Sequence, residues 1–131
     1  MNAKPFFDTN ILIYAFLKGD PRQEVAKMLL AEGGIIAVQT VNEFVAVARR
    51  KLGMNWVEVI EALAAIRVLC PVLLPLTMET HEAALRIAAR YEYHIFDSLV
   101  IAAALEASCS TLYSEDMQNG QIQGLTIRNP F

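Results

Sequence analysis

Several features that identify other classes of protein are missing from this sequence of 131 residues. No apolar run reaches the roughly eighteen residues of a membrane span, and the N-terminus lacks a signal-peptide pattern. We therefore expect a cytoplasmic protein with no membrane segment. The two cysteines, Cys70 and Cys109, have no C-x-x-C spacing, and we expect both to be reduced and buried. The net charge of −3 argues against a protein that coats nucleic acid through positive potential alone, but not against an enzyme that acts on it through metal ions.

What is present is a globular composition, with 55% hydrophobic and 19% charged residues, which suits a single domain over residues 1–131. Predicted strands alternate with predicted helices, a pattern typical of a parallel sheet covered by helices on both faces. We therefore predict an α/β fold with three layers, α/β/α, and a central, mainly parallel sheet. Strands are predicted at residues 4–7, 35–38, 111–113 and 125–127, with 72–76 as a strand or an extended linker. Helices are predicted at residues 9–17, 21–33, 41–52, 56–69, 78–93 and from Asp97 onward.

One carboxylate, Asp97, precedes a continuous apolar run in the stretch HIFDSLVIAAALEA. A helix that is apolar on every side is buried, so Asp97 is expected to begin a helix that runs through the core. A buried carboxylate is costly unless it is paired, hydrogen-bonded or bound to a metal. One interpretation is an N-cap, with Phe96 and Ile101 as the hydrophobic staple that often accompanies it. The other interpretation is a metal ligand.

Other carboxylates also have local structural explanations when each is taken alone. Asp8 follows an apolar strand and opens a helix, which permits a simple N-cap. Glu43 completes the pattern Thr-x-x-Glu with Thr40, which is the sequence form of a capping box. Glu115 and Asp116 follow a predicted strand, where a polar turn accounts for either residue.

The shared placement of these acids is harder to explain by local structure. Asp8, Glu43 and Asp116 all lie just beyond the carboxyl end of a predicted strand, and open parallel sheets bind ligands at that edge. Asp97 would join them from the start of a helix. No Lys or Arg adjoins any of the four in the sequence, so their convergence requires an external cation. Ligands that offer only oxygen select a hard divalent ion, Mg²⁺ or Mn²⁺.

Four stretches resemble, in order and spacing, the acidic motifs of the PIN domain: FFDTNILIYA, VNEF, FDSLVIAAALEA and LYSEDMQNG. The whole chain is similar to stand-alone ribonuclease toxins of the VapC type. This resemblance implies an endoribonuclease that depends on Mg²⁺, or on Mn²⁺, and acts as the toxin of a toxin–antitoxin pair. It also implies an RNA substrate, a cognate antitoxin as partner, and a homodimer. The resemblance assigns catalysis and metal binding to Asp8, Glu43, Asp97 and Asp116, with Thr9, Asn10 and Ser114 as supporting polar residues.

Two other interpretations of the acidic residues stay open. One is an inactive PIN-like binding module whose acids only cap helices. The other is a different Mg²⁺-dependent enzyme that handles phosphoryl groups. The Asp-x-Asp motif of haloacid dehalogenase-like phosphatases is absent, because Asp8 is followed by Thr9 and Asn10. A metal titration separates the binding module from the nuclease, since scattered helix caps do not bind Mn²⁺. Glu115 is expected to face away from Asp116, because neighbours in an extended segment point in opposite directions.

Two further groups of residues have alternative explanations. The basic run Arg49, Arg50 and Lys51 ends the third predicted helix, where cations interact favourably with the helix dipole. The alternative is that these cations steer RNA phosphates. Several apolar residues have the spacing of core positions, with a groove for a partner as the alternative: Met28, Leu29, Trp56, Val57, Ile60 and Leu63.

Overall fold

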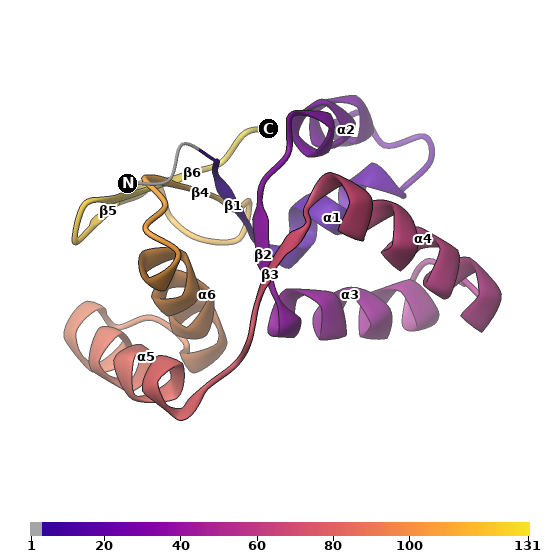
Figure 1. The fold of residues 1–131 in the computed structure, drawn as a ribbon. Helices are drawn as coiled ribbons and strands as arrows, with labels where there is room; N and C mark the ends of the chain where they lie inside the picture. Colours follow the sequence, from indigo (N-terminus) through magenta and orange to yellow (C-terminus); the bar gives the residue numbers. More distant parts are fainter. Residues whose placement is uncertain (1–3) are drawn as a thin grey trace.

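The computed structural model describes residues 4–131 and contains one mixed sheet between two layers of helices (Figure 1). Residues 1–3 of the predicted domain lie outside this range. The elements in chain order are β1 (Phe6–Phe7), α1 (Thr9–Ala15), α2 (Arg22–Glu32), β2 (Ile35–Ala37), α3 (Val38–Arg50), α4 (Trp56–Leu69), β3 (Val72–Leu74), α5 (Met78–Tyr91), α6 (Ile95–Glu106), β4 (Thr111–Tyr113), β5 (Gly120–Ile122) and β6 (Leu125–Arg128).

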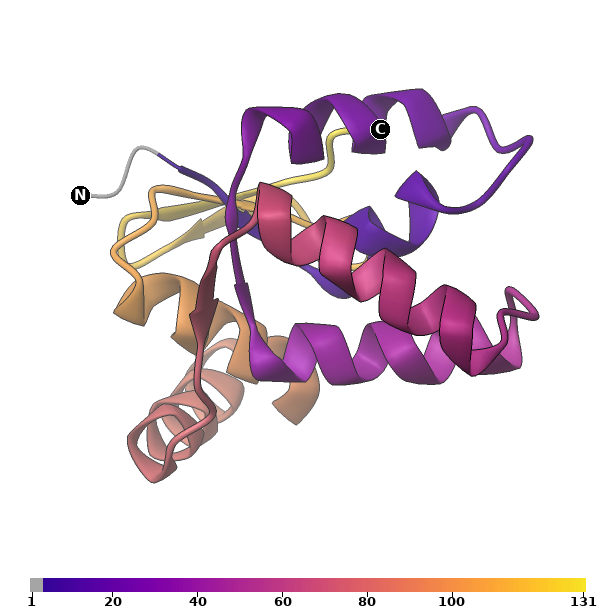
Figure 2. The ribbon, with the colours of Figure 1, turned by 45° about the vertical axis from the view of Figure 1, so that its right-hand side comes forward.

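The strands are ordered β3-β2-β1-β4-β6-β5, and all neighbouring pairs are parallel except β5 with β6. Helices α1 to α4 cover one face of the sheet, and α5 and α6 cover the other, as both views show (Figures 1 and 2). The predicted three-layer fold with a mainly parallel sheet is therefore confirmed. The segment 72–76 resolves as a strand at residues 72–74, and the antiparallel strand β5 was not predicted.

Alternation along the short central strands divides the core into two halves. Phe6 packs in the half under α5 and α6, whereas Phe7 packs in the half under α1 to α4, and both are fully buried. Residues 98–104 of α6 are all buried, which confirms the predicted helix through the core. Cys70 and Cys109 are free and buried, as predicted.

One expected helix boundary and one expectation about packing are wrong. Helix α3 begins at Val38 and not at Val41, because the β-branched end of the predicted strand already has helical geometry. Met28, Trp56 and Ile60 were interpreted as core or packing positions, but their side chains are exposed, as is that of Val57. Helical spacing alone did not reveal which face of α4 packs into the core. No helix within residues 4–131 is long and apolar enough to cross a membrane.

Gly34, just before β2, allows a close approach of the backbone to the buried ring of Phe7. A Cβ atom built on Gly34 lies 2.3 Å from Cε2 of that ring, far inside van der Waals contact. We therefore expect Gly34→Ala to lower the free energy of unfolding by about 1–3 kcal/mol, the usual cost of overpacking a core. Urea denaturation measures this change. Gly120→Ala is the matched control, because a Cβ there meets nothing within 4 Å, and equal stability of the two variants would contradict the packing argument.

Candidate active site

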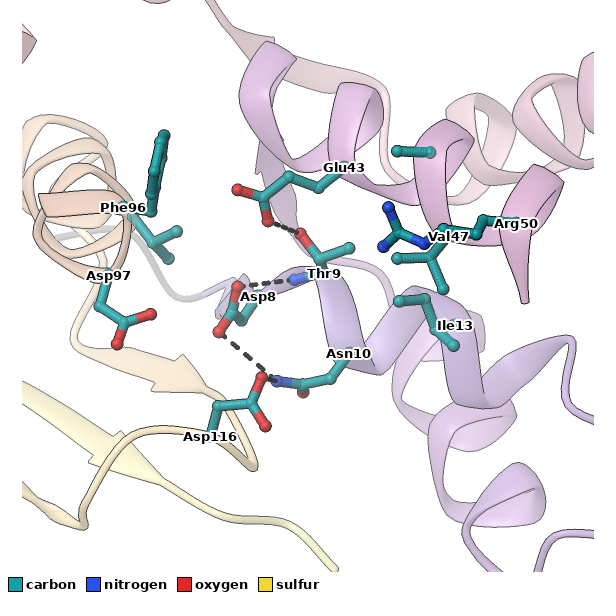
Figure 3. Close-up of a pocket in the computed structure, with 12 residues that line it drawn as sticks. Asp8, Thr9, Asn10, Ile13, Glu43, Val47, Arg50, Phe96, Asp97 and Asp116 are labelled. Atoms are coloured by element: carbon teal, nitrogen blue, oxygen red, sulfur yellow. Dashed lines mark hydrogen bonds between the residues drawn. The ribbon is translucent and has the colours of Figure 1, made fainter. Parts of the chain in front are cut away.

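The order of the strands creates a switch point beside β1. From β1 the chain moves outward through β2 to β3, then returns across the other face and places β4 on the opposite side of β1. Loops that leave the carboxyl ends of β1 and β4 therefore diverge and open a crevice, the usual ligand-binding position in such sheets. A pocket of about 290 Å³ lies there, lined by Asp8, Glu43, Asp97 and Asp116 (Figure 3). The fold thus brings all four predicted acids to one pocket.

Asp8 is the most deeply placed of these acids, with 5% of its surface exposed. It follows β1 and caps α1, and its Oδ1 accepts a hydrogen bond from the backbone N–H of Thr9 at 2.7 Å. Its Oδ2 accepts one from the Ser114 hydroxyl at 2.7 Å. Burial raises the pKa of Asp8 to about 6, with a smaller contribution from the negative charges of Asp97 and Glu43, although both hydrogen bonds oppose the shift. Asp8 is therefore the N-cap of α1, and burial in the pocket destabilises its charged form.

Asn10 connects the two strand ends that form the crevice. Its side-chain N–H donates to Oδ2 of Asp116 at 3.2 Å, and its Oδ1 accepts from the backbone N–H of Glu115 at 3.2 Å. Asp116 itself is exposed, so this amide is its hydrogen-bonded contact with the buried part of the site. The predicted supporting residues Asn10 and Ser114 thus tie the segment after β4 to the start of α1.

Glu43 does not belong to a capping box, which corrects the sequence interpretation. Ala37 is the N-cap of α3, and the backbone N–H of Ala37 donates to Oγ1 of Thr40 at 3.4 Å. Glu43 lies further along the helix, where Oε2 accepts from the Thr9 hydroxyl at 2.8 Å and Oε1 accepts from Nε2 of Gln39 at 3.1 Å. Glu43 therefore faces the pocket, held from α1 by the predicted supporting residue Thr9.

Asp97 lies in the first turn of α6 and is not its N-cap, which is His94. Burial raises the pKa of Asp97, and the nearby carboxylates of Asp116 and Glu43 add to the shift, while His94 opposes it. The predicted hydrophobic staple is also wrong, because Phe96 is 61% exposed while its proposed partner is in the core. Asp97 thus has no capping role that explains its position beside the other acids.

Glu115 faces away from the pocket, as expected for a residue that precedes Asp116 in an extended segment. Its carboxylate accepts from Nη1 of Arg22 at 2.9 Å and from the Tyr14 hydroxyl, while the Arg22 guanidinium also pairs with Asp20. The guanidinium stacks over the Tyr14 ring at 3.9 Å. This cluster fixes the residue next to Asp116 to the α1–α2 connection.

The donor set of the pocket fits a hard divalent cation. Within residues 4–131 no group of three His, Cys, Asp or Glu side chains is arranged to hold a metal ion directly. Mg²⁺, however, keeps several of its waters and binds through one or two carboxylates together with substrate phosphate. Burial first, and the neighbouring carboxylates second, raise the pKa values of Asp8 and Asp97, and a bound cation would stabilise both charged forms. Asp8, Asp97, Asp116 and Glu43 would hold such an ion, partly through water.

Two residues that line the pocket, and one that holds a pocket carboxylate, were not assigned to the site from the sequence. Arg50 and Phe96 line the pocket, and Gln39 holds Glu43. Arg50 follows Glu43 by seven residues, which is close to two helical turns and places both on one face of α3. That spacing was a signal for Arg50, whereas Phe96 was assigned to a staple that does not form.

The PIN domain family profile matches residues 6–121. The chain belongs to the PIN domain family. No curated protein sequence matches it. This PIN domain is similar in fold to solved toxin structures, at sequence identities that support the fold alone.

Three of these structures cover most of the chain. VapC20 of Mycobacterium tuberculosis, a toxin that cleaves the sarcin–ricin loop, has a TM-score of 0.70 at 21% identity, covering 86% of this chain and 92% of that one. A toxin–antitoxin complex from Klebsiella pneumoniae has a TM-score of 0.75 at 19% identity, covering 98% of each chain. VapBC2 from Rickettsia felis, bound to promoter DNA, has a TM-score of 0.66 at 18% identity, covering 95% of this chain and 96% of that one.

Proposed function

We propose that this PIN domain is an endoribonuclease that depends on Mg²⁺ or Mn²⁺ and serves as the toxin of a toxin–antitoxin pair. The observation that carries the proposal is the pocket at the switch point, where four carboxylates from four different segments meet (Figure 3). Helix caps have no reason to gather in one pocket. Two of these acids, Glu43 and Asp97, have no capping contact in the structure.

The chain's own residues would prepare this site for phosphodiester hydrolysis. Asp8 and Asp97 supply charge in a partly dehydrated environment, where electrostatic interactions are stronger than in water. Thr9, Asn10 and Ser114 orient the carboxylate oxygens through the hydrogen bonds described above. A bound divalent ion supplies a more acidic water and offsets charge on the scissile phosphate. No histidine or serine nucleophile is required for this chemistry.

Exposed apolar side chains support the proposed antitoxin partner. On α4, Val57, Ile60 and Val68 are 64%, 64% and 79% exposed, and they recur along one side of the helix. Large exposed apolar side chains grouped in this way mark protein interfaces more often than free surface. The related Klebsiella pneumoniae structure is a toxin–antitoxin complex. We also propose that the protein is cytoplasmic and forms a homodimer. Sedimentation of the purified chain tests the homodimer.

The proposed activity is tested by incubating the purified, antitoxin-free protein with total RNA. We expect cleavage with Mg²⁺ or Mn²⁺ and none with chelator. Glu43→Gln is expected to lower cleavage at least tenfold, because its amide still accepts from Thr9 but cannot contribute negative charge toward an ion. Its melting temperature should change little, since Glu43 caps no helix. Absence of cleavage by the wild-type protein, together with no response to Mn²⁺, would instead favour the inactive binding module.

A further inference from the structure

Two consecutive arginines at the end of α3 have different environments. Arg49 donates from Nη1 to the carbonyl oxygen of Met54 at 3.0 Å, and its guanidinium lies 4.5 Å from the centre of the Trp56 ring. Arg49 therefore fastens the connection between α3 and α4. Arg50 is also exposed, but it lines the acidic pocket, and no hydrogen bond or ion pair engages it within residues 4–131. Arg49 thus has a structural role, whereas the contacts in the described residues give Arg50 none.

The carboxylate on the same helix face does not engage Arg50. Both oxygens of Glu43 already accept hydrogen bonds, from Thr9 and Gln39. Seven residues of α-helix rise about 10 Å, so Arg50 lies further along the pocket than Glu43. Figure 3 shows its guanidinium directed back along the pocket toward Thr9. A guanidinium presents donors in a rigid fork that matches two phosphate oxygens, so Arg50 is suited to a phosphate.

An exposed aromatic ring lies on the other side of the carboxylates. Phe96 belongs to α6, lines the same pocket and is 61% exposed (Figure 3). Within the described residues its ring stacks on no other aromatic side chain. Its carbonyl oxygen accepts from Nε2 of Gln39 at 3.5 Å, which ties this turn of α6 to α3. An aromatic face of this kind stacks on a nucleobase with little dependence on which base it is.

We infer that Arg50 binds a phosphate next to the scissile one, and that the Phe96 ring stacks on an unpaired base on the opposite side of the carboxylates. This inference rests on the proposed nuclease function and adds the residues that hold the RNA strand. The pocket contains four carboxylates and the chain carries a net charge of −3, so a polyanion needs a local cation to enter. A base stacks on Phe96 only after it has left its own helix, so the bound segment is single-stranded.

The phosphate contact is tested by binding of a labelled single-stranded RNA oligonucleotide, measured by fluorescence anisotropy in Ca²⁺ at several salt concentrations. A gel verifies that the RNA stays intact. We expect Arg50→Ala to weaken binding about tenfold and to reduce the slope of log K against log salt by about 0.7, the value for one lost phosphate contact on a single strand. Arg50→Lys should keep the slope but bind more weakly than the wild type, because it loses the forked geometry.

Arg49→Ala is the matched control, since it removes the same charge one residue away. Its salt slope should stay within experimental error of the wild-type slope, because Arg49 is engaged by Met54 and Trp56. Equal effects of the two substitutions would overturn the assignment and leave only general charge attraction. Thermal melts establish that both variants fold, and the salt slope is a readout that a purely structural role would not change.

The stacking contact is tested by Phe96→Leu and Phe96→Trp on the same oligonucleotide. Loss of the ring is expected to weaken single-strand binding about tenfold, whereas Trp retains it, because stacking needs an aromatic face. Binding of a duplex of equal length should not respond to Phe96→Leu. If Phe96→Leu alters the sedimentation of the protein but not its affinity for RNA, Phe96 belongs to a contact between copies and its assignment fails.

The outcomes for this inference and for the proposed function are distinct. Cleavage of RNA by the wild-type protein, with binding that is indifferent to Arg50 and Phe96, would overturn the inference and support the nuclease. Binding that depends on both residues without cleavage in Mg²⁺ would support the inference and reject the nuclease. A wild-type protein that neither binds nor cleaves RNA would reject both.

Discussion

Asp8→Asn is expected to reduce Mg²⁺-dependent RNA cleavage on the order of a hundredfold or more, because it removes the most buried charge of the proposed metal site. The amide oxygen still accepts from the backbone of Thr9, so the N-cap of α1 survives. The Ser114 hydroxyl can rotate to accept from the new amide, so the hydrogen bond with Ser114 is also preserved, and only the long contact from Nδ2 of Asn10, at 3.5 Å, is lost. Rates of cleavage of a defined RNA oligonucleotide, measured for both proteins at saturating Mg²⁺, test this expectation.

Ser114→Ala is the informative companion variant. It leaves every carboxylate in place but removes the hydroxyl that donates to Asp8, so we expect a smaller loss of activity than Asp8→Asn causes. Circular dichroism and thermal melting establish that both variants are folded. Full activity of a folded Asp8→Asn protein would rule out a metal site that depends on this carboxylate.

The position of the site followed from the sequence because three acids come after predicted parallel strands. Strand ends in such a sheet lie along one edge, so Asp8 and Asp116 meet once β1 and β4 pair in parallel. Asp97 was recognised by the conflict between its charge and the buried helix that follows it. The fold class followed from the same alternation of strands and helices.

Local capping was the least predictable feature, because helix boundaries depend on tertiary contacts. Residues Ile35–Val38 have strong strand propensity, yet Val38 already belongs to α3, which displaced the expected capping box from Glu43. His94 takes the capping position that was expected for Asp97. In both cases the misplaced cap had offered a structural explanation for a pocket residue, and the correct boundary removes it.

Arg50 and the ring of Phe96 were not assigned to the pocket from the sequence, and the reason differs from that for the helix caps. Arg50 belongs to a basic run at a helix end, where the helix dipole alone accounts for it, and the sequence does not separate it from Arg49. Only the contacts of Arg49 with Met54 and Trp56 show that the two arginines differ. β5 lacked a signal because it is three residues long, Gly-Gln-Ile, and only its last residue favours a strand, so the strand depends on its antiparallel pairing with β6.

Mn²⁺ at a hundredfold excess over its dissociation constant is expected to raise the melting temperature of the wild-type protein by about 10 °C at pH 7. Binding to the folded state alone contributes about 2.7 kcal/mol at that excess, and a domain of this size shifts by roughly 4 °C per kcal/mol. The shift should shrink at pH 5, because the pKa of Asp8 is raised to about 6 and protons then compete with the ion for its carboxylate. Melts with and without Mn²⁺ at both pH values measure it.

The same pKa fixes the sign of the effect in the metal-free protein. The pKa of Asp8 rises from 3.8 in the unfolded chain to about 6 in the folded one, so its protonated form stabilises the fold below pH 3.8, and that stability is lost as the pH rises through 6. The difference, 6 − 3.8 = 2.2, corresponds to roughly 3 kcal/mol at pH 7. Asp8→Asn should therefore melt higher than the wild type at pH 7 without metal, with an advantage that narrows toward pH 4.

Asp20→Asn provides a control of opposite sign. Hydrogen bonds from Arg22 lower the pKa of Asp20 to about 2, so its charge stabilises the folded state, and that stability is present above the unfolded pKa and lost as the pH falls through 2. The same chemical substitution should therefore lower the melting temperature at pH 7 while the response to Mn²⁺ persists. If Asp8→Asn also melts lower than the wild type without metal, the charge of Asp8 stabilises the folded state as a helix cap and does not destabilise it through burial. A wild-type protein whose melting temperature does not respond to millimolar Mn²⁺ would contradict the metal site, because an ion that binds only the folded state stabilises that state.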